Sequence, residues 1–127
     1  MHTKIKTHST VPTRDKVINM VEWLADKKGK DMLALDLSKE NSLSEAMIIA
    51  TAGSTRHGQG LADHLLSEAG KENYEFLRVE GRNVGQWILL DFNDVIVHIF
   101  QQDSRDLFRL EDLWPSAAVL ADMRKEE

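Results

Sequence analysis

Two short apolar runs that lie close together in the sequence restrict what this chain can fold into. Trp87–Leu90 and Val95–Phe100 are rich in aliphatic and aromatic residues, and only Asp91–Asp94 separates them. Aspartate and asparagine accept turn geometry, and Asn93 tolerates a positive φ better than most residues. The pattern therefore predicts a β-hairpin. Because both runs are almost wholly apolar, we expect both faces of the hairpin to be covered.

Helical and strand patterns alternate along the rest of the chain. Apolar residues recur with helical spacing from Thr13 to Lys28 and again up to Ala69. Ala46–Ala52 is uniformly apolar, which is typical of a strand buried on both faces. The expected helices are 13–28, 54–69 and 103–113, and the expected strands are Met32–Leu37, Ala46–Ala52, Tyr74–Val79, Trp87–Leu90 and Val95–Phe100.

This order of elements predicts a single α/β domain with a mixed five-stranded sheet flanked by helices. Short links favour antiparallel pairs, and the middle helix permits one parallel crossover. Residues 1–12 are polar and are expected to form a flexible leader. Residues 13–115 are expected to form the folded domain, and residues 116–127 a polar tail.

Composition excludes several classes of function. The chain has 127 residues and no cysteine, so disulfides, thiolate zinc sites and cysteine nucleophiles are absent. No apolar run approaches the roughly 20 residues that span a bilayer, and no secretory signal is visible. We therefore expect a soluble cytoplasmic protein. A net charge of −5 is poorly suited to broad phosphate contact and better suited to a basic protein surface.

The turn at Gly53 and Ser54 joins a buried strand to a helix. Backbone N–H groups at such a helix start can bind phosphate. Nucleotidyltransferases also carry Gly-Ser there, but their chemistry needs paired carboxylates to hold metal ions. The following stretch, His57 to Gly70, contains only two carboxylates, Asp63 and Glu68, and both lie within a helical pattern. A capped helix is therefore the favoured interpretation of this turn.

Asp36, Asp91, Asp94 and His98 could in principle converge as metal ligands. Asp91 and Asp94, however, occupy positions where turns favour aspartate. A histidine inside an apolar strand is more often hydrogen-bonded to a neighbour than catalytic. We therefore favour turn chemistry and a core hydrogen bond over a metal or catalytic site.

Two histidines on the middle helix, His57 and His64, are seven residues apart and could share a face. Their spacing does not match the zinc motif in which two histidines flank a glutamate. His57 is expected either to face solvent or to make a polar contact across the neighbouring turn. Ser54 and His57 do not form a convincing nucleophile pair, because no orienting acid can be identified.

Trp87 is the strongest candidate for a binding residue. It begins a strand at the margin of the sheet, where a half-exposed tryptophan is a typical interface anchor. Packing beneath the first helix as ordinary core is the alternative. The acidic residues Glu80, Asp91 and Asp94 favour an interface with a basic partner.

A set of sequence blocks runs in consistent order along the chain: Leu35-Asp36-Leu37-Ser38, Ile49–His57, Ala62-Asp63, Arg78-Val79-Glu80-Gly81, Trp87–Asp91, Asp94–Phe100 and Leu113-Trp114. In these blocks the chain resembles the ribosomal silencing factor family, also called Iojap-like. Two departures are visible: Asn93 stands where glycine is usual, and Phe108 stands where tyrosine is common.

This resemblance implies a fold related to nucleotidyltransferases but without their catalytic carboxylates. It also implies a protein that is not an enzyme and uses no cofactor or metal. Members of the family bind the large ribosomal subunit through its protein number fourteen and block joining of the small subunit, which represses translation when nutrients are scarce. Homodimers are also implied. A metal-dependent nucleotidyltransferase-like enzyme is the alternative.

The resemblance also carries a set of partner-binding residues onto this sequence. The family's contact tryptophan matches Trp87. Surface segments of the family match Asp91, Phe92 and Phe108, and the weaker matches are Glu80 and Arg105. Since Phe108 lacks a hydroxyl, it can supply an apolar contact there but no hydrogen bond.

Overall fold

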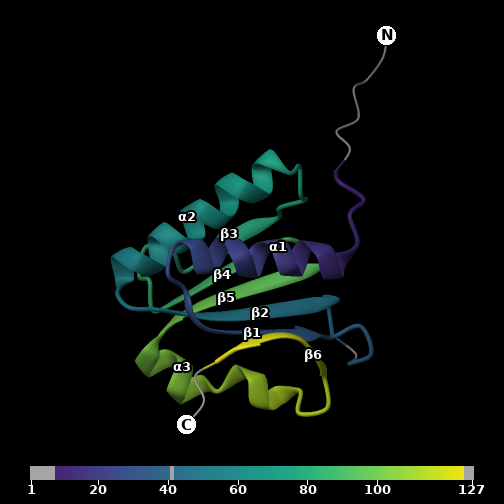
Figure 1. Ribbon diagram of the computed structural model, residues 1–127. Coiled ribbons are helices and arrows are strands. Elements are labelled where there is room, and N and C mark those ends of the chain that lie inside the picture. Colours follow the sequence, from purple (N-terminus) through teal and green to yellow (C-terminus); the bar gives the residue numbers. More distant parts are fainter. Residues whose placement is uncertain (1–7, 41, 125–127) are drawn as a thin grey trace.

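The computed structural model describes residues 8–40 and 42–124, which form a sheet with helices on both faces. α1 (Thr13–Asp26) and α2 (Thr55–Lys71) cover one face, and α3 (Gln102–Phe108) lies on the other (Figure 1). None of the helices in this described part is long and apolar enough to span a bilayer. The strands are β1 (Lys30–Asp36), β2 (Ala46–Ala52), β3 (Arg78–Glu80), β4 (Trp87–Asp91), β5 (Val95–Gln101) and β6 (Ala118–Met123), and a short 3₁₀ helix, η1, spans Leu110–Leu113.

The sheet has the order β3-β4-β5-β2-β1-β6. β2 and β5 pair in parallel at its centre, and every other neighbouring pair is antiparallel. The predicted hairpin is confirmed as β4 and β5, in which Trp87 lies opposite Phe100. Asn93 in its turn has a φ of 75°, so the tolerance of asparagine for this conformation is used here.

The sheet contains six strands, so the prediction of five is wrong. The additional strand, β6, pairs antiparallel with β1 at the edge and lies within residues 116–127, which the sequence pattern assigned to a polar tail. None of its side chains is fully buried. The sequence does hold a short apolar run there, Ala117–Ala121, but the prediction of a tail followed the charged residues at the end of the chain. The third strand is also shorter than expected, since it begins at Arg78 rather than at Tyr74.

The larger core lies between the sheet and the two long helices. Each helix contributes an apolar stripe, because residues three and four apart share one face of a helix. Burying one such side chain contributes roughly 1.5–3 kcal/mol. The stripe of α1 is Val17, Met20, Val21 and Leu24, and that of α2 is Leu61, Ala62, Leu65 and Ala69.

A smaller apolar cluster lies on the opposite face of the sheet. Its buried members are Leu33, Leu35, Leu37, Met47, Ile49 and Phe100. α3 packs against β5 and β2, which leaves the adjoining part of this face less covered. Trp87, Leu89 and Ile96 are accordingly only partly buried. The expectation that both faces of the hairpin are covered is therefore wrong for this part of β4 and β5.

Candidate functional site

Four aromatic rings gather on the partly covered face of the sheet, and we call Trp87, His98, Phe100 and Phe108 the aromatic patch. Alternate residues of a strand point to the same face, so Trp87 and the opposed Phe100 meet there. The centroid of the Trp87 ring lies 4.9 Å from that of Phe100 and 5.0 Å from that of Phe108. Phe108 comes from α3 and is 50% exposed. The patch thus consists of two buried rings, His98 and Phe100, and two more exposed rings, Trp87 and Phe108.

A hydrogen bond fixes the orientation of Trp87. Its indole Nε1–H donates to Nδ1 of His98 over 2.9 Å. His98 is buried, and this burial lowers its pKa from 6.5 to about 4. The imidazole is therefore neutral near neutral pH, with its proton on Nε2, because Nδ1 is the acceptor. The prediction that His98 hydrogen-bonds a neighbour is confirmed, and that neighbour is the candidate binding residue.

We expect a His98→Asn variant to lose less stability in acid than the wild-type protein. Between pH 6.5 and about 4 the unfolded chain binds the histidine proton more readily than the folded chain. The contribution of the neutral His98 side chain to the free energy of unfolding is therefore fully present above pH 6.5, and it is lost as the pH falls toward about 4. Between about pH 7 and about pH 5, the wild type should lose about 2 kcal/mol more unfolding free energy than the variant. Urea unfolding at several pH values measures this difference.

The variant is a matched control, because the asparagine side-chain oxygen can still accept from Trp87 but does not titrate. Carboxylates elsewhere in the chain contribute equally to both proteins and cancel in the comparison. Parallel stability–pH curves for the two proteins would show that His98 is not the responsible group.

A shallow pocket adjoins the Trp87 ring. It has a volume of about 310 Å³ and is lined by Glu80, Gly81, Trp87 and Leu89. The Glu80 side chain is 60% exposed and pairs with Arg78 over 3.3 Å. The patch therefore has an apolar pocket with a carboxylate at its margin. Leu89 was missed by the sequence reasoning, although its position two residues after Trp87 on one strand places both on the same face.

The structure places Asp91 and Phe92 mainly inside the protein. Asp91 is 8% exposed, and its carboxylate accepts from the backbone N–H of Asn93 over 2.8 Å, so it stabilises the hairpin turn. Phe92 is 1% exposed and packs against Phe76, with ring centroids 5.4 Å apart. The expectation that the Phe92 side chain lies at the surface is therefore wrong, because the turn directs this ring into the larger core.

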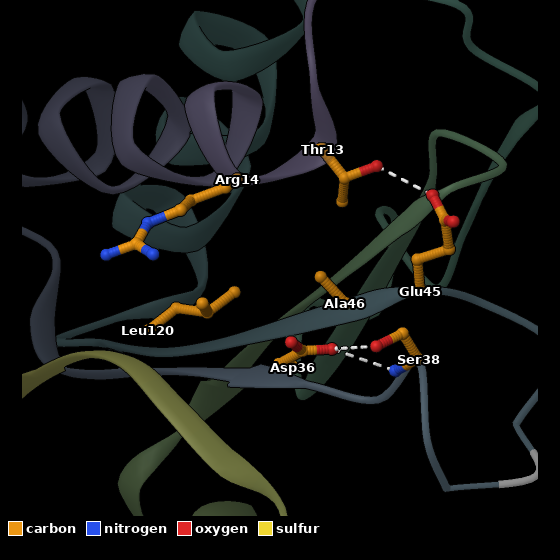
Figure 2. A pocket seen from close by; sticks show the side chains of 7 residues that line it. All are labelled: Thr13, Arg14, Asp36, Ser38, Glu45, Ala46 and Leu120. Carbon is orange, nitrogen blue, oxygen red and sulfur yellow. Dashed lines mark hydrogen bonds between the residues drawn. The ribbon is translucent and has the colours of Figure 1, made fainter.

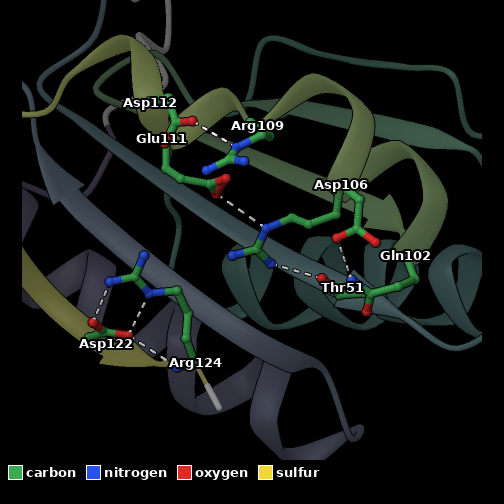
Figure 3. A network of polar contacts seen from close by, with 9 residues as sticks. Thr51, Gln102, Asp106, Arg109, Glu111, Asp112, Asp122 and Arg124 are labelled. Carbon is green, nitrogen blue, oxygen red and sulfur yellow. Dashed lines mark hydrogen bonds and ion pairs between the residues drawn. The ribbon is translucent and has the colours of Figure 1, made fainter. Parts of the chain in front are cut away.

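Arg105 is also buried, with 7% of its surface exposed. Its Nη1 donates to Thr51 Oγ1 over 2.8 Å, and its Nε lies 3.3 Å from Glu111 Oε2. Figure 3 labels these two partners, Thr51 and Glu111. Arg105 is the only buried residue of α3 and η1, both of which lie within the described part of the chain. Arg105 therefore anchors the segment that presents Phe108. Sequence spacing did not indicate this role, because Thr51 lies 54 residues away on β2 and Glu111, only six residues away, belongs to the separate helix η1.

The polar groups at the Gly53–Ser54 turn are used within the fold. Ser54 Oγ accepts from the backbone N–H of His57 over 3.0 Å, which confirms the capped helix. The His57 ring accepts from Gly53 N over 2.9 Å and donates to the Lys27 carbonyl oxygen over 2.7 Å. Of the two alternatives for His57, the polar contact across a turn is therefore the one observed.

The four residues considered as metal ligands do not form a metal site in the described part of the chain. Within residues 8–40 and 42–124, no group of three or more histidine and acidic side chains is arranged to hold an ion. Asp36 instead accepts from Ser38, and Asp94 pairs with Lys16 over 3.0 Å. His64 is separate from these groups, and its buried Nε2 has no hydrogen-bond partner in the same described residues.

The fold and the site together define a mixed α/β domain with a partly open aromatic sheet face. The sequence model of the family described as "Ribosomal silencing factor during starvation" matches residues 10–127. The chain belongs to this family of ribosomal silencing factors, as its resemblance to Iojap-like sequences predicted.

Individual relatives agree with this assignment. A ribosomal silencing factor of Haemophilus influenzae is 38% identical over 95 residues, which cover 75% of this chain and 93% of the relative. One from Chromobacterium violaceum is 39% identical over 103 residues, covering 78% and 84%. A crystal structure of a Chromobacterium violaceum protein superposes with a TM-score of 0.79 at 35% identity, covering 86% of this chain and 94% of that one.

Proposed function

We propose that this protein binds the large ribosomal subunit through its protein number fourteen and thereby prevents the small subunit from joining. The proposal rests on the aromatic patch, whose Trp87 ring is partly exposed on a chain of the silencing factor family. No group in this mechanism undergoes a reaction. Repression of translation would follow from steric exclusion alone.

The chemistry of the patch supports a protein partner. Tryptophan and phenylalanine supply most of the binding energy in many interfaces, particularly where a ring enters a pocket. Trp87 is held by contacts with His98, Phe100 and Phe108, so little side-chain freedom remains to be lost on binding. Phe108 supplies exposed apolar area beside it.

The charge of the protein supports a basic partner. The chain carries a net charge of −5, and the Glu80 carboxylate lies at the margin of the pocket beside Trp87. Opposite charge on a partner raises the association rate and fixes orientation more than it raises affinity. In this proposal Trp87 and Phe108 bind the partner, Glu80 attracts it, and Arg105 positions α3 without touching it.

A subunit-joining assay tests the proposed function. Purified small and large subunits are mixed with and without an excess of this protein and separated on a sucrose gradient. We expect joined ribosomes to decrease and the protein to sediment with the large subunit. Because the proposed mechanism is exclusion from one surface, the protein should act when added before joining and have less effect on ribosomes already joined.

Two results would overturn the proposal. One is an unchanged amount of joined ribosomes when the protein is present in excess before mixing. The other is sedimentation of the protein with the small subunit only. Adding ATP and magnesium to parallel samples also tests the enzymatic alternative, because conversion of the nucleotide would contradict a mechanism based on binding alone.

A further inference from the structure

The pocket beside Trp87 lies on the partly exposed side of β3 and β4. Glu80 on β3 is opposite Leu89 on β4, and opposed residues of neighbouring strands point to the same face of a sheet. Trp87 lies two residues before Leu89, so its side chain points to that face as well. Strand register therefore brings these three side chains together, and with Gly81 they line a pocket of about 310 Å³.

The walls of this pocket are aromatic and aliphatic, and its margin carries a carboxylate. The Trp87 indole is partly exposed and is held by its hydrogen bond to His98, 2.9 Å between Nε1 and Nδ1. Leu89 is also partly exposed. Gly81 adds no side chain, because a Cβ there would overlap the Trp87 carbonyl oxygen. A long side chain with an apolar stem and a charged end fits this combination of surfaces.

The charges next to the pocket do not balance. Arg78, on the same face as Glu80, lies 3.3 Å from Glu80 and 3.8 Å from Asp91. Within residues 8–40 and 42–124, no other cation lies within 4.0 Å of either carboxylate. One guanidinium therefore serves two carboxylates, and one negative charge is left without a counter-charge.

An incoming cation could bind Glu80 without leaving Asp91 unpaired. The Arg78 and Glu80 side chains are 59% and 60% exposed, and an ion pair this exposed contributes little to stability. The Asp91 side chain is 11% exposed, so its contact with Arg78 is the better shielded of the two. Arg78 can therefore stay with Asp91 while another cation takes its place at Glu80.

The cavity at the start of α1 offers no comparable convergence (Figure 2). It has a similar volume, about 320 Å³, and charged side chains also line it. The Arg14 guanidinium is, however, directed away from the carboxylates of Asp36 and Glu45. Of these two cavities, only the pocket at Trp87 therefore brings an apolar wall and a charge to the same point.

We propose that the pocket at Trp87 receives an arginine side chain of the partner protein, an inference that rests on the proposed function. The stem would lie on Leu89, the guanidinium would stack on the Trp87 indole, and its N–H groups would donate to Glu80. Arginine is favoured over lysine because a guanidinium is planar, stacks on aromatic rings and binds a carboxylate through two N–H groups at once. An acidic side chain is disfavoured, since it would meet Glu80.

The test in the free protein is an NMR titration of the ¹⁵N-labelled full chain with three capped amino acids. They are N-acetyl-arginine amide, the corresponding lysine compound, and the corresponding citrulline compound, which has the shape of arginine without its charge. We expect N-acetyl-arginine amide to give saturable shifts at the Trp87 indole N–H and at the amides of Gly81 and Leu89. Because a single exposed contact is weak, its dissociation constant should be on the order of 10 mM. The lysine compound should bind at least about threefold more weakly and the citrulline compound at least about tenfold more weakly.

The variant Glu80→Gln connects the signal to the pocket. Glutamine keeps the length of the side chain and removes its charge, so N-acetyl-arginine amide should bind about tenfold more weakly to this variant. The matched control is Glu72→Gln, which removes an exposed carboxylate at the end of α2 and should leave the titration unchanged. The dispersion of the amide spectra shows whether each variant is folded.

The same two variants are then compared for binding to the large ribosomal subunit. Glu80→Gln should bind about fivefold more weakly at low salt, and the difference should shrink as the salt concentration rises, because screening weakens exposed charge contacts. Glu72→Gln should bind like the wild type at every salt concentration.

The inference is wrong if N-acetyl-arginine amide gives no saturable shift, or if the citrulline or lysine compound binds equally well. It is also wrong if Glu80→Gln changes neither the titration nor binding to the large subunit. The titration contains no ribosomes, and the subunit-joining assay contains no capped amino acid. Failure of this inference is therefore distinguishable from failure of the proposed function.

Discussion

Replacing Trp87 by alanine should abolish detectable binding to the large ribosomal subunit under conditions where the wild type binds. The substitution removes the ring that contacts Phe100 and Phe108, and it leaves the pocket at Glu80 and Gly81 without its aromatic wall. Truncation of such an anchor costs about 2 kcal/mol or more, or roughly thirtyfold in affinity. Co-sedimentation with purified large subunits over a range of protein concentrations measures this loss.

The control for this experiment is Trp23→Ala. Trp23 is also a partly buried tryptophan, but it packs against Tyr74, 5.7 Å between ring centroids, in the core beneath α1 and α2. Both variants should lose some stability, measured by circular dichroism on heating, and only Trp87→Ala should lose binding. If the folded Trp87→Ala variant binds as the wild type does, the aromatic patch is not the interface.

Replacing Gly81 by alanine should destabilise the fold by about 3 kcal/mol and disturb the position of Trp87. Gly81 has a φ of +79°, which costs any residue with a Cβ free energy, and an added Cβ would overlap the carbonyl oxygen of Trp87. Since the overlapped carbonyl oxygen belongs to the backbone, the chain between β3 and β4 must shift. Equilibrium unfolding in urea gives the free-energy change, and the indole N–H resonance of Trp87 reports its bond to His98.

Gly60→Ala is the matched control for this substitution. Gly60 lies within α2, and an added Cβ would have no atom within 4 Å. Because alanine favours a helix over glycine, this variant should be more stable by up to about 1 kcal/mol. If Gly81→Ala is as stable as the wild type, the turn after β3 is less constrained than this structure implies.

Two buried polar contacts hold the rings of the aromatic patch in place. His98 fixes the Trp87 ring from within the sheet, and Arg105 fixes α3 from the side. The first depends on a neutral imidazole, since a protonated one could not accept from the indole. The second depends on a guanidinium whose partners lie on β2 and η1. Both are buried polar contacts, and neither residue is positioned to be the main contact itself.

Local patterns were sufficient to predict the elements that form most of the fold. The spacing of Val17, Met20, Val21 and Leu24 predicted α1, and the uniformly apolar Ala46–Ala52 predicted the central strand. Local patterns failed where burial is incomplete. β6 has no fully buried side chain, and the expected C-terminal helix is divided at Arg109, which has a φ of 43°. The short apolar run Ala117–Ala121 is a signal for β6 that was overlooked, whereas no periodicity marks the break at Arg109.

In the candidate site, too, the sequence identified some of the residues, whereas their surroundings depend on the tertiary structure. Trp87 was identified because a half-exposed tryptophan at the margin of a sheet is a typical interface anchor. Glu80 was identified as an acidic neighbour and by resemblance, and Phe108 by resemblance. The actual surroundings of these residues depend on register: Trp87 meets Phe100 only because β4 and β5 pair with that alignment. The burial of Phe92 and Arg105 could not be predicted, because each packs against residues distant in the sequence.

The sequence by itself determined the α/β class, the hairpin and its turn, the two long helices and the family. These properties follow from short-range periodicity, turn chemistry and shared motifs, each of which is contained within a few neighbouring residues. The tertiary structure alone decided the sixth strand, the assembly of the aromatic patch, the anchoring by Arg105 and the pocket between Glu80 and Trp87. These depend on contacts between distant segments, and such contacts are fixed only when the whole sheet has formed.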